Sequence, residues 1–482
     1  MRLGELCKGL MNIPAGCGEL DVSEVVCDSR KAVEGSLFLA VPGETTDGFL
    51  FAREAVSNGA VAVIAPRGGC GEASLGVPVL KVEDLRGVMG DIADRFYGEP
   101  SKELEVVGVT GTKGKTTTVW LLHHLFSRMD STAGFCSTVE NRIGEESSEA
   151  KNTTMGCLDL HRFLAELVEK GGKRAVIEVS SHALEQQRTA SIRFDCAVFT
   201  NLAPEHLDYH EDMDSYLAAK MKLFSSLDSH AYAVLPRSQE VSKVIAGNTL
   251  ANLSWYGRGS EDGVTGIRVM DEGMEFTWRD CRFSTGFWGD HNLENLLAVL
   301  SAGECMGLKP DEMAAAISEA RLPPGRLEKI DHPGPYKVVV DYAHTDGALE
   351  AVLEALRPVT PGRLITIFGC GGDRDTAKRP RMGKVAESGS DRVILTSDNP
   401  RSESPEKILS EIKAGLERPE EATLEVDRRD AIGLGIRMAR EGDTVLIAGK
   451  GHEDYQEFSD RKRIHFDDRE VARDFLQEVC HV

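Results

Sequence analysis

The stretch LEVVGVTGTKGKTTTVWLLHHLFSRM, residues 104–129, decides the fold class of this chain. It joins an apolar, β-rich run to a glycine- and lysine-containing turn and then to a helical segment, which is typical of a phosphate-binding loop in a parallel α/β sheet. In such a loop the backbone N–H groups meet phosphate oxygens, Lys115 adds a positive charge and Thr116 can ligate Mg²⁺. The position five before Gly114 is Val109, where the general Walker pattern has glycine. A plain glycine-rich turn is the alternative, but it gives the lysine no task.

The rest of the chain is expected to form two further domains, because 482 residues exceed what one hydrophobic core organises. Short apolar runs precede the turn-rich GEPSK near Gly98, and PPGR follows the last segment of the central pattern near Leu322. The class is therefore α/β. We expect a small N-terminal α/β domain at 1–98, a central P-loop domain with a parallel sheet at 99–323, and a doubly wound, Rossmann-like C-terminal domain at 324–482.

The expected C-terminal domain repeats one pattern four times, an apolar β-rich run followed by a polar or glycine-rich tail. The four runs are YKVVVDYAH (336–344), LITIFGCGGDRD (364–375), RVILTSDNPR (392–401) and TVLIAGKGHED (444–454). In open parallel sheets ligands bind beyond the carboxyl ends of the strands. We therefore expect these four tails to line one crevice.

Composition excludes several classes of partner. Lys and Arg total 56 against 78 for Asp and Glu, and the net charge of −22 repels polyanions, so we expect neither a nucleic-acid nor a membrane partner. The eleven cysteines lack paired metal-ligand spacing, and we find neither a secretory leader nor an apolar stretch of membrane-spanning length. We expect a soluble, cytoplasmic, monomeric protein with reduced thiols that acts on small molecules.

Two charged residues occupy positions where burial is expected. Glu178 lies near the end of the apolar run RAVIEVS, where an unpaired carboxylate is costly, so a metal or a basic partner should be near. Lys220 lies in the helical segment SYLAAKMKLF, with aromatic and leucine side chains three and four positions away, whereas Lys222 faces alanine and serine. A lysine on an apolar face either snorkels to a nearby acid or is chemically altered.

Two further polar groups have competing explanations. The loop NLAPEHLDYH offers oxygen and imidazole ligands for Mg²⁺, but taken alone a structural loop explains its histidines better. The segment GCGGDRDTAKRPRMGK could attract an anion, or it could be the solvated start of a helix. The side chains concerned are Glu205, His206, Asp208 and His210 in the first group and Arg374, Lys378, Arg379, Arg381 and Lys384 in the second.

Together these motifs resemble the Mur ligase family over nearly the whole chain. The motifs that carry the resemblance are GTKGKTT (111–117), NTT (152–154), EVSSHAL (178–184), HLDYH (206–210), PGRLE (324–328), DYAHT (341–345) and GKGHEDYQ (449–456). DSR (28–30), GCGGDRD and DNPR (398–401) are similar to the branch that adds meso-diaminopimelate. The resemblance implies an ATP-dependent ligase of peptidoglycan precursor synthesis. Such an enzyme phosphorylates a carboxylate of UDP-N-acetylmuramoyl-L-alanyl-D-glutamate, and an amine then attacks the acyl phosphate.

The resemblance also implies roles for residues of the central domain and of the third domain's first segments. The residues expected to bind ATP are Gly111, Thr112, Lys113, Gly114, Lys115, Thr116, Thr117, Asn292, Arg326 and Asp341. The residues expected to be catalytic are Lys115, Glu178, His206 and Lys220, and those expected to hold Mg²⁺ are Thr116, Glu178, His206 and Lys220. Lys220 matches the lysine that the family carbamylates, which replaces a buried cation by an anion.

Two more sets of residues are implied for the other substrates. The set for the UDP-linked precursor is Ser29, Asn152, Thr153, Thr154, Ser180, Gln186, Arg188 and carbamylated Lys220. The set for diaminopimelate is Arg374, Asp398, Asn399, Pro400, Arg401, Gly449 and Glu453. Diaminopimelate differs from lysine by a second carboxylate, which a guanidinium binds through two parallel hydrogen bonds, so Arg401 should attract diaminopimelate and repel the ammonium end of lysine.

Several other functions stay open at this point. A sibling ligase could add L-lysine to the same precursor or a dipeptide one step later, and folate polyglutamation is a third ligase reaction. A P-loop ATPase that uses hydrolysis as a conformational switch belongs to another class. A switch would hydrolyse ATP without consuming an amino acid, so product formation discriminates between these classes. A pure nucleotide-binding module would leave Glu178, His206 and Lys220 without a task.

Overall fold

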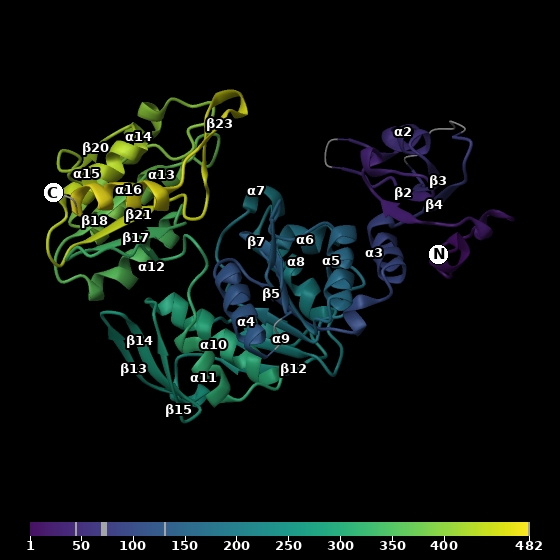
Figure 1. Ribbon diagram of the computed structural model, residues 1–482, viewed down its shortest axis with the longest axis horizontal. Coiled ribbons are helices and arrows are strands. Elements are labelled where there is room, and N and C mark those ends of the chain that lie inside the picture. The colour runs from purple at the N-terminus through teal and green to yellow at the C-terminus, as the bar shows by residue number, and fades with distance from the viewer. Residues whose placement is uncertain (44–45, 69–74, 130–131, 481–482) are drawn as a thin grey trace. The chain divides into compact units, whose positions relative to one another are not determined.

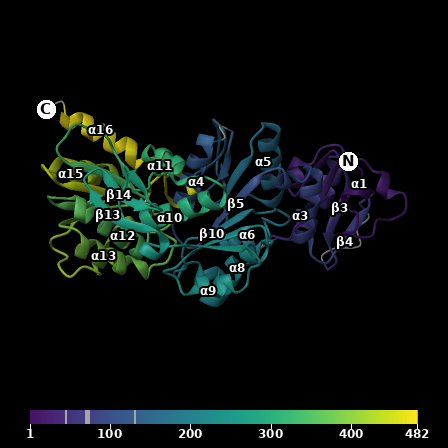
Figure 2. The ribbon, with the colours of Figure 1, turned by 90° about the horizontal axis from the view of Figure 1, so that it is seen from below.

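The computed structural model describes residues 1–43, 46–68, 75–129 and 132–480, which fall into two compact units (Figures 1 and 2). The first unit comprises residues 1–256 and 301–307, and the second comprises residues 257–300 and 308–482. Both units are built from α-helices and mainly parallel sheets, so the predicted α/β class is confirmed. The three domain boundaries given above stay predictions.

A four-stranded parallel sheet opens the first unit, in the order β1-β2-β3-β4. Leu37 and Leu39 belong to the core on one face, whereas Phe38 belongs to the core on the other. Because side chains alternate along a strand, the wholly apolar run LFLA suits a strand covered on both faces. The elements are α1 (Leu3–Leu6), β1 (Glu24–Val26), β2 (Ser36–Leu39), α2 (Ala52–Ser57), β3 (Ala60–Pro66), β4 (Val79–Val82) and α3 (Leu85–Phe96).

The second sheet of the first unit has eight strands in the order β12-β11-β10-β5-β9-β6-β7-β8. The six strands from β12 to β6 are parallel, β7 pairs antiparallel with β6, and β8 pairs antiparallel with β7. In both views β5 lies between α4 and α8. Glycine at 108 permits this packing, because a Cβ there would lie 2.9 Å from the Phe194 ring and 3.3 Å from Leu223. The strand–turn–helix predicted for residues 104–129 is confirmed.

The strands of this second sheet are β5 (Glu105–Thr110), β6 (Gly134–Cys136), β7 (Glu140–Ile143), β8 (Glu146–Glu149), β9 (Arg174–Glu178), β10 (Cys196–Phe199), β11 (Tyr232–Pro236) and β12 (Asn252–Tyr256). Its helices are α4 (Lys115–Met129), α5 (Cys157–Glu169), α6 (Ser181–Glu185), α7 (Leu207–His210), α8 (Met213–Ser225) and α9 (Val241–Ala246).

A three-stranded antiparallel sheet opens the second unit, and the sequence analysis did not predict it. Its signal was the alternation in GMEFTW, where Met274, Phe276 and Trp278 are buried and the intervening residues are less so. Arg279 and Asp280, both with positive φ, turn the chain between its last two strands. The elements are β13 (Val264–Met270), β14 (Gly273–Trp278), β15 (Cys281–Thr285), α10 (Asp290–Cys305) and α11 (Pro310–Ser318).

The last sheet has the order β16-β17-β21-β18-β19-β20 and is parallel except for β16. Side chains from α12, α13 and α14 fill the core on one face, and those from α15 and α16 fill the core on the other, so the predicted doubly wound arrangement is confirmed. The elements are β16 (Glu328–Lys329), β17 (Lys337–Asp341), α12 (Asp346–Leu356), β18 (Leu364–Phe368), α13 (Lys378–Gly389), β19 (Arg392–Leu395), α14 (Pro405–Lys413), β20 (Thr423–Leu424), α15 (Arg428–Met438), β21 (Thr444–Ala448), β22 (Tyr455–Glu457), β23 (Arg463–His465) and α16 (Asp468–Cys480).

The thiols and the helix lengths can be compared with the sequence-based expectations. The cysteines whose side chains are described carry free thiols, while Cys70 and the side chain of Cys480 lie outside the described residues. Within the described part of the chain, no helix is both long and apolar enough to cross a bilayer.

Candidate functional site

The loop between β5 and α4 is shaped by glycines. Gly111 has φ +148°, and a Cβ there would lie 2.0 Å from the Thr200 hydroxyl oxygen, so no larger residue fits without displacing β10's end. Gly114 has φ +84°, and α4 begins one residue later at Lys115. The backbone therefore approaches closely and turns into a helix N-terminus, which is the geometry that binds phosphate.

Two ammonium groups converge on one carbonyl oxygen of this loop. Lys115 Nζ lies 3.1 Å and Lys220 Nζ 2.8 Å from the Gly111 carbonyl oxygen. Lys220 is 1% exposed, with Nζ 4.2 Å from the centroid of the Tyr216 ring. Burial and the neighbouring Lys115 charge lower the pKa of Lys220 well below its ordinary value. The predicted position on the apolar face is confirmed, and Lys222 instead pairs with Glu185 at the surface.

Glu178 accepts its hydrogen bonds from neutral donors. Its carboxylate oxygens lie 3.0 and 3.1 Å from the Thr116 hydroxyl, 2.9 Å from the Thr138 backbone N and 3.1 Å from the Thr138 hydroxyl. The sequence predicted a metal or a basic partner, but these hydroxyl and N–H groups already compensate the buried carboxylate. Thr138 was missed by the sequence analysis; its signal was a polar Ser-Thr pair directly after the short strand β6.

Several residues predicted to bind the UDP-linked precursor lie together beside Glu178. The buried Thr154 hydroxyl donates to the Glu178 carbonyl oxygen at 2.7 Å and accepts from the Ser180 N–H at 3.0 Å. Arg188 donates to the Thr154 carbonyl oxygen at 2.9 Å and to the Gln186 amide oxygen at 2.8 and 3.1 Å. The Thr153 hydroxyl oxygen lies 3.2 Å from that of Thr138, and Asn152 is exposed on the same segment.

A cavity of about 210 Å³ continues from this cluster towards the first sheet of the same unit. Its charged lining is mostly cationic and consists of Lys31, Arg86, Arg162, Arg188, Asp28 and Asp159. Ser29 lies beside Asp28, and its hydroxyl donates to Glu54 at 2.5 Å. Arg86 was missed by the sequence analysis; it reaches the Pro42 carbonyl oxygen at 2.8 Å and the Gln186 carbonyl oxygen at 3.4 Å. The lining suits an anionic ligand.

The histidine loop lies on α7 next to α6. His206 is exposed, has φ +57°, and its ring centroid lies 4.9 Å from that of His182. His210 is buried, with Nε2 2.9 Å from the Ser181 hydroxyl oxygen, so it holds α7 against α6. Across the described ranges, no three side chains of His, Cys, Asp or Glu gather closely enough to hold a metal ion. Any metal there would need oxygen ligands from a substrate as well.

The four tails of the last sheet meet at one edge, as predicted. Their strands are adjacent in the order β17-β21-β18-β19, and backbone hydrogen bonds join the Gly449 N–H to the Asp341 carbonyl oxygen and the Gly372 N–H to the Asn399 carbonyl oxygen. Gly449 has φ +121°, and a Cβ there would lie 2.6 Å from the Asp398 carboxylate. The Gly449 backbone in the GKGHED tail therefore lies close to the Asp398 side chain in the DNPR tail.

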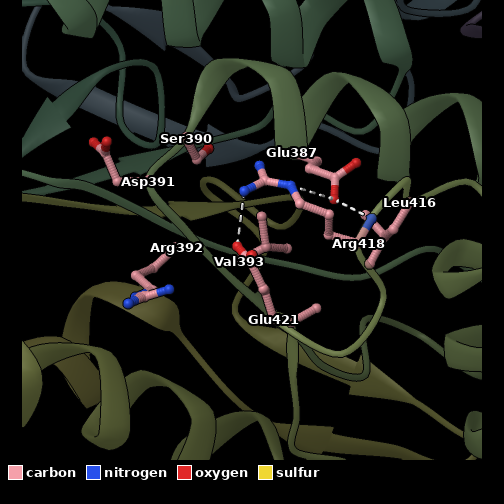
Figure 3. Close-up of a pocket in the computed structure, with 9 residues that line it drawn as sticks. Glu387, Ser390, Asp391, Arg392, Val393, Leu416, Arg418 and Glu421 are labelled. Carbon is pink, nitrogen blue, oxygen red and sulfur yellow. Dashed lines mark hydrogen bonds and ion pairs between the residues drawn. The ribbon is translucent and has the colours of Figure 1, made fainter.

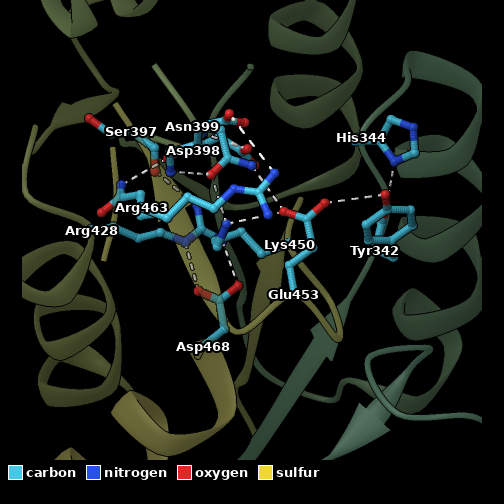
Figure 4. A network of polar contacts seen from close by, with 12 residues as sticks. Tyr342, His344, Ser397, Asp398, Asn399, Arg428, Lys450, Glu453, Arg463 and Asp468 are labelled. Atoms are coloured by element: carbon cyan, nitrogen blue, oxygen red, sulfur yellow. Dashed lines mark hydrogen bonds and ion pairs between the residues drawn. The ribbon is translucent and has the colours of Figure 1, made fainter. Parts of the chain in front are cut away.

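Acidic and amide groups of these tails form a buried network (Figure 4). Asn399 donates from Nδ2 to Glu453 at 2.9 Å, and Glu453 also accepts from the Tyr342 hydroxyl at 3.4 Å. Burial works to raise the pKa of Asp398, but the Lys450 and Arg428 charges outweigh it and hold that pKa below its ordinary value. The Asp398 carboxylate is therefore negatively charged at neutral pH.

Arg401 is held in a fixed orientation at the edge of this network. Its φ of +50° is rare for a side-chain-bearing residue, and its guanidinium donates to the Gly372 carbonyl oxygen at 2.7 Å and to Glu457 at 3.1 Å. Pro400 is buried beside Gly372, whose added Cβ would lie 1.9 Å from the Pro400 carbonyl oxygen. Arg374, in contrast, is exposed and donates only weakly to the Asp373 carbonyl oxygen, at 3.5 Å.

Three residues of the second unit are predicted to contact the nucleotide. Arg326 lies over the Tyr342 ring at 4.7 Å from its centroid. Asp341 accepts from the Leu327 and Ala343 N–H groups at 2.7 Å each, and burial raises its pKa although the Arg326 charge opposes this. Asn292 is buried and donates to the Trp288 carbonyl oxygen at 2.8 Å. Their role in binding ATP stays a prediction.

A buried ion pair beneath the network was missed by the sequence analysis. Arg428 and Asp468 are each 0% exposed and joined by two hydrogen bonds of 2.7 Å. Arg428 also donates to the Ser397 carbonyl oxygen at 3.2 Å and to the Ala448 carbonyl oxygen at 3.0 Å, so it bridges the ends of β19 and β21. Both residues begin helices, where an isolated sequence gives them the ordinary appearance of solvated charges.

The basic segment at the start of α13 is partly structural. Arg379 is buried and paired with Glu403 at 2.8 Å and with Glu411, while Arg381 faces Asp346 at 3.1 Å. A cavity of about 20 Å³ lies at the other end of β19, and Figure 3 draws its lining residues. There Glu387 accepts from the backbone N–H groups of Glu417 and Arg418. That volume suits about one water molecule, so this cavity is not a substrate site.

The first unit thus has a P-loop and a cavity with a mostly cationic lining, and the second has polar and charged side chains gathered at the strand ends of a doubly wound sheet, which is typical of an α/β enzyme that binds phosphate. The sequence matches the models for "Mur ligase family, catalytic domain" at residues 21–97, "Mur ligase middle domain" at 109–303 and "Mur ligase, glutamate ligase domain" at 325–451. The chain belongs to the Mur ligase family.

Curated relatives align over almost the whole chain. The UDP-N-acetylmuramoyl-L-alanyl-D-glutamate--2,6-diaminopimelate ligase of Solibacter usitatus is 40% identical over 99% of this chain and 98% of its own. The protein of the same name from Gloeobacter violaceus is 41% identical over the same shares. A solved structure of a ligase with that name is 32% identical, covers 100% of both chains and has a TM-score of 0.74. MurF from Thermotoga maritima in complex with ADP, at 22% identity over 94% of this chain and 96% of its own and a TM-score of 0.63, shows the same fold.

Proposed function

We propose that this protein is the ATP-dependent ligase that joins meso-diaminopimelate to UDP-N-acetylmuramoyl-L-alanyl-D-glutamate in peptidoglycan precursor synthesis. The observation that carries the amino-acid part is the set of polar groups at the ends of β19 and β21: Asn399 donates to the Glu453 carboxylate, and two residues later the Arg401 guanidinium is held by the Gly372 carbonyl oxygen and by Glu457. A ligand that presents a carboxylate and an ammonium at the same end complements this arrangement, and diaminopimelate is such a ligand.

The first step is phosphoryl transfer to a substrate carboxylate. ATP phosphates would lie against the N–H groups of residues 111–117 and the side chain of Lys115, where the backbone is already shaped by Gly111. The Thr116 hydroxyl and the Glu178 carboxylate lie 3.0 Å apart and are the hard oxygen donors that Mg²⁺ prefers, so the residues fit this ion. Mg²⁺, when bound, neutralises phosphate charge.

Lys220 has the surroundings that carbamylation requires. Carbon dioxide adds to a neutral amine with loss of a proton, and burial together with the Lys115 charge lowers the pKa of Lys220, which favours the neutral amine. The product is an anion, which would attract the neighbouring Lys115 instead of repelling it. His206 would complete the metal site with Thr116, Glu178 and this carbamate.

The UDP-linked precursor is assigned to the cationic cavity of the first unit. Arg188 and Gln186 line it directly, Ser29 adjoins it, and Thr154 and Ser180 connect it to Glu178. A diphosphate needs such cations locally, because the net charge of −22 repels it elsewhere. Asn152 and Thr153 lie on the same segment as Thr154. We propose a cytoplasmic location, since the reaction consumes ATP, and a monomeric enzyme.

A ligation assay read by mass spectrometry tests the proposal. Purified protein receives Mg-ATP and UDP-N-acetylmuramoyl-L-alanyl-D-glutamate, with meso-diaminopimelate and L-lysine offered separately and together. We expect a diaminopimelate-dependent tripeptide product and equimolar ADP. A lysine product would keep the reaction but overturn the assignment of Arg401. ADP released without any ligated product would support the ATPase switch.

A further inference from the structure

Lys450 is a fully buried lysine whose side chain contacts the polar network drawn in Figure 4. Its Nζ lies 3.1 Å from Asn399 Oδ1 and 3.2 Å from Glu453 Oε2, and 5.3 Å from the centroid of the Tyr455 ring. A buried ammonium is costly unless its hydrogen bonds are made, so at 0% side-chain exposure Lys450 depends on its contacts with Asn399 and Glu453.

Lys450 makes one of three contacts that fix which way the Asn399 amide points. Oδ1 accepts from Lys450 Nζ and from the Glu457 backbone N–H at 2.9 Å, while Nδ2 donates to the Glu453 carboxylate at 2.9 Å. All three contacts require the same orientation of the amide, because an ammonium and a backbone N–H only donate and a carboxylate only accepts. Among the contacts of the described residues Nδ2 makes one hydrogen bond, so its second N–H is available to a ligand.

The orientation of this amide has a chemical consequence. An amide that presents N–H to the site favours a ligand carboxylate, whereas a reversed amide would present its carbonyl oxygen and favour an ammonium. Without Lys450, Oδ1 would lose its cationic donor, and one of the contacts that exclude the reversed orientation would disappear.

We propose that Lys450 is a positioning residue that sets amino-acid specificity by fixing Asn399 as a hydrogen-bond donor towards a substrate carboxylate. The inference rests on the proposed function and goes beyond it, since it assigns the choice between an amino acid with a second carboxylate and one without it to a side chain that acts through Asn399. The Arg401 guanidinium supplies the positive charge for the substrate carboxylate. Lys450 keeps the Asn399 amide from turning its carbonyl oxygen towards that carboxylate.

Steady-state ligation by Lys450→Met tests this inference. We expect the ratio of kcat/KM for diaminopimelate to that for L-lysine to fall by about ten-fold or more, through KM for diaminopimelate, with KM for ATP changed less than about two-fold. Lys462→Met, an exposed lysine on the β22–β23 hairpin, is the control and should keep the wild-type ratio. Because the ratio is measured on one protein sample, a smaller folded fraction does not alter it.

A second variant approaches the amide from the other side. Asn399→Asp keeps the shape and both acceptor contacts of Oδ1 but replaces the donor by an oxygen, so it should lower the same ratio even if Lys450→Met does not fold. In an Asn399→Ala background, Lys450→Met should change the ratio less than about two-fold, because its partner is gone.

The outcomes separate this inference from the proposed function. A wild-type enzyme that ligates diaminopimelate, with a ratio unchanged in Lys450→Met or in Asn399→Asp, would overturn the role of Lys450 alone. An undiminished effect of Lys450→Met in the Asn399→Ala background would also overturn it. A wild-type enzyme that forms no diaminopimelate product would overturn the proposed function, and this inference with it.

Discussion

Replacing Arg428 by methionine should destabilise the C-terminal sheet strongly. The substitution removes two hydrogen bonds of 2.7 Å to Asp468 and leaves that carboxylate buried at 0% exposure without its cation. It also frees the Ser397 and Ala448 carbonyl oxygens at the ends of β19 and β21. Breaking a buried pair from one side costs about 3 to 5 kcal/mol, because an uncompensated charge stays behind.

The neighbouring arginine provides a matched control. Arg429 pairs with Asp474 at 2.9 Å, but both side chains are about half exposed, so Arg429→Met should cost less than about 1 kcal/mol. The double variant Arg428→Met with Asp468→Leu should recover most of the loss, because no lone charge is then buried.

Hydrogen exchange read by mass spectrometry measures these effects locally, which a chain of two compact units requires. Amides of β19 and β21 should exchange about 100-fold faster or more in Arg428→Met, and at nearly the wild-type rate in Arg429→Met. A cost for Arg428→Met as small as that for Arg429→Met would refute the argument. A double variant no more stable than Arg428→Met would refute it as well.

Four further predictions concern the first unit and the amino-acid site. Lys220→Ala should be nearly inactive and partly rescued by a short added carboxylic acid; full activity without rescue would exclude a carbamate. Arg401→Ala should lose diaminopimelate use, seen as a raised KM, while calorimetric binding of ATP and of the nucleotide sugar is kept; weakened ATP binding would contradict its placement. Gly111→Ala should lower kcat/KM for ATP about 100-fold or more, because its Cβ has no room, whereas Gly171→Ala, with positive φ but open space, should cost only about 1 kcal/mol of stability and no activity. Burial lowers the pKa of the His123 imidazole to about 4, from its ordinary value of 6.5. As the pH drops from about 6.5 to 4, the unfolded state therefore takes up the proton before the folded state does, and the free energy of unfolding should fall by about 2 to 3 kcal/mol. Urea unfolding of His123→Gln should lack this part of the loss, and an unchanged pH dependence would contradict it.

The sequence predicts well those features that depend on local pattern. Residues 104–129 indicate a strand, a loop and a helix in turn, because β-branched residues, glycines and an apolar run each favour a different local structure. The four tails of the last sheet were placed together because parallel strands end at one edge. Lys220 was assigned to an apolar face from the side chains three and four positions away, and it is buried.

Features that depend on contacts distant in sequence were not predicted. Glu178 accepts hydrogen bonds from Thr116 and Thr138, 62 and 40 residues away, and these neutral donors were not predicted; a metal beside Glu178 stays a prediction. Arg428 finds Asp468 40 residues later, and nothing local distinguishes either from a solvated charge at a helix start. Lys450 lies in the motif GKGHEDYQ, but only the fold reveals that its ammonium contacts the Asn399 amide, 51 residues earlier.

The shared carbonyl of Gly111 makes activity and durability compete in this enzyme. Two ammonium charges aimed at one oxygen would repel each other, and burial adds a desolvation cost for Lys220, so the pKa of Lys220 is lowered and a buried polar side chain is left at the price of stability. Replacing Lys220 by methionine removes this cost and should therefore give a protein that is harder to unfold yet unable to ligate. The loop thus gives up stability for chemistry.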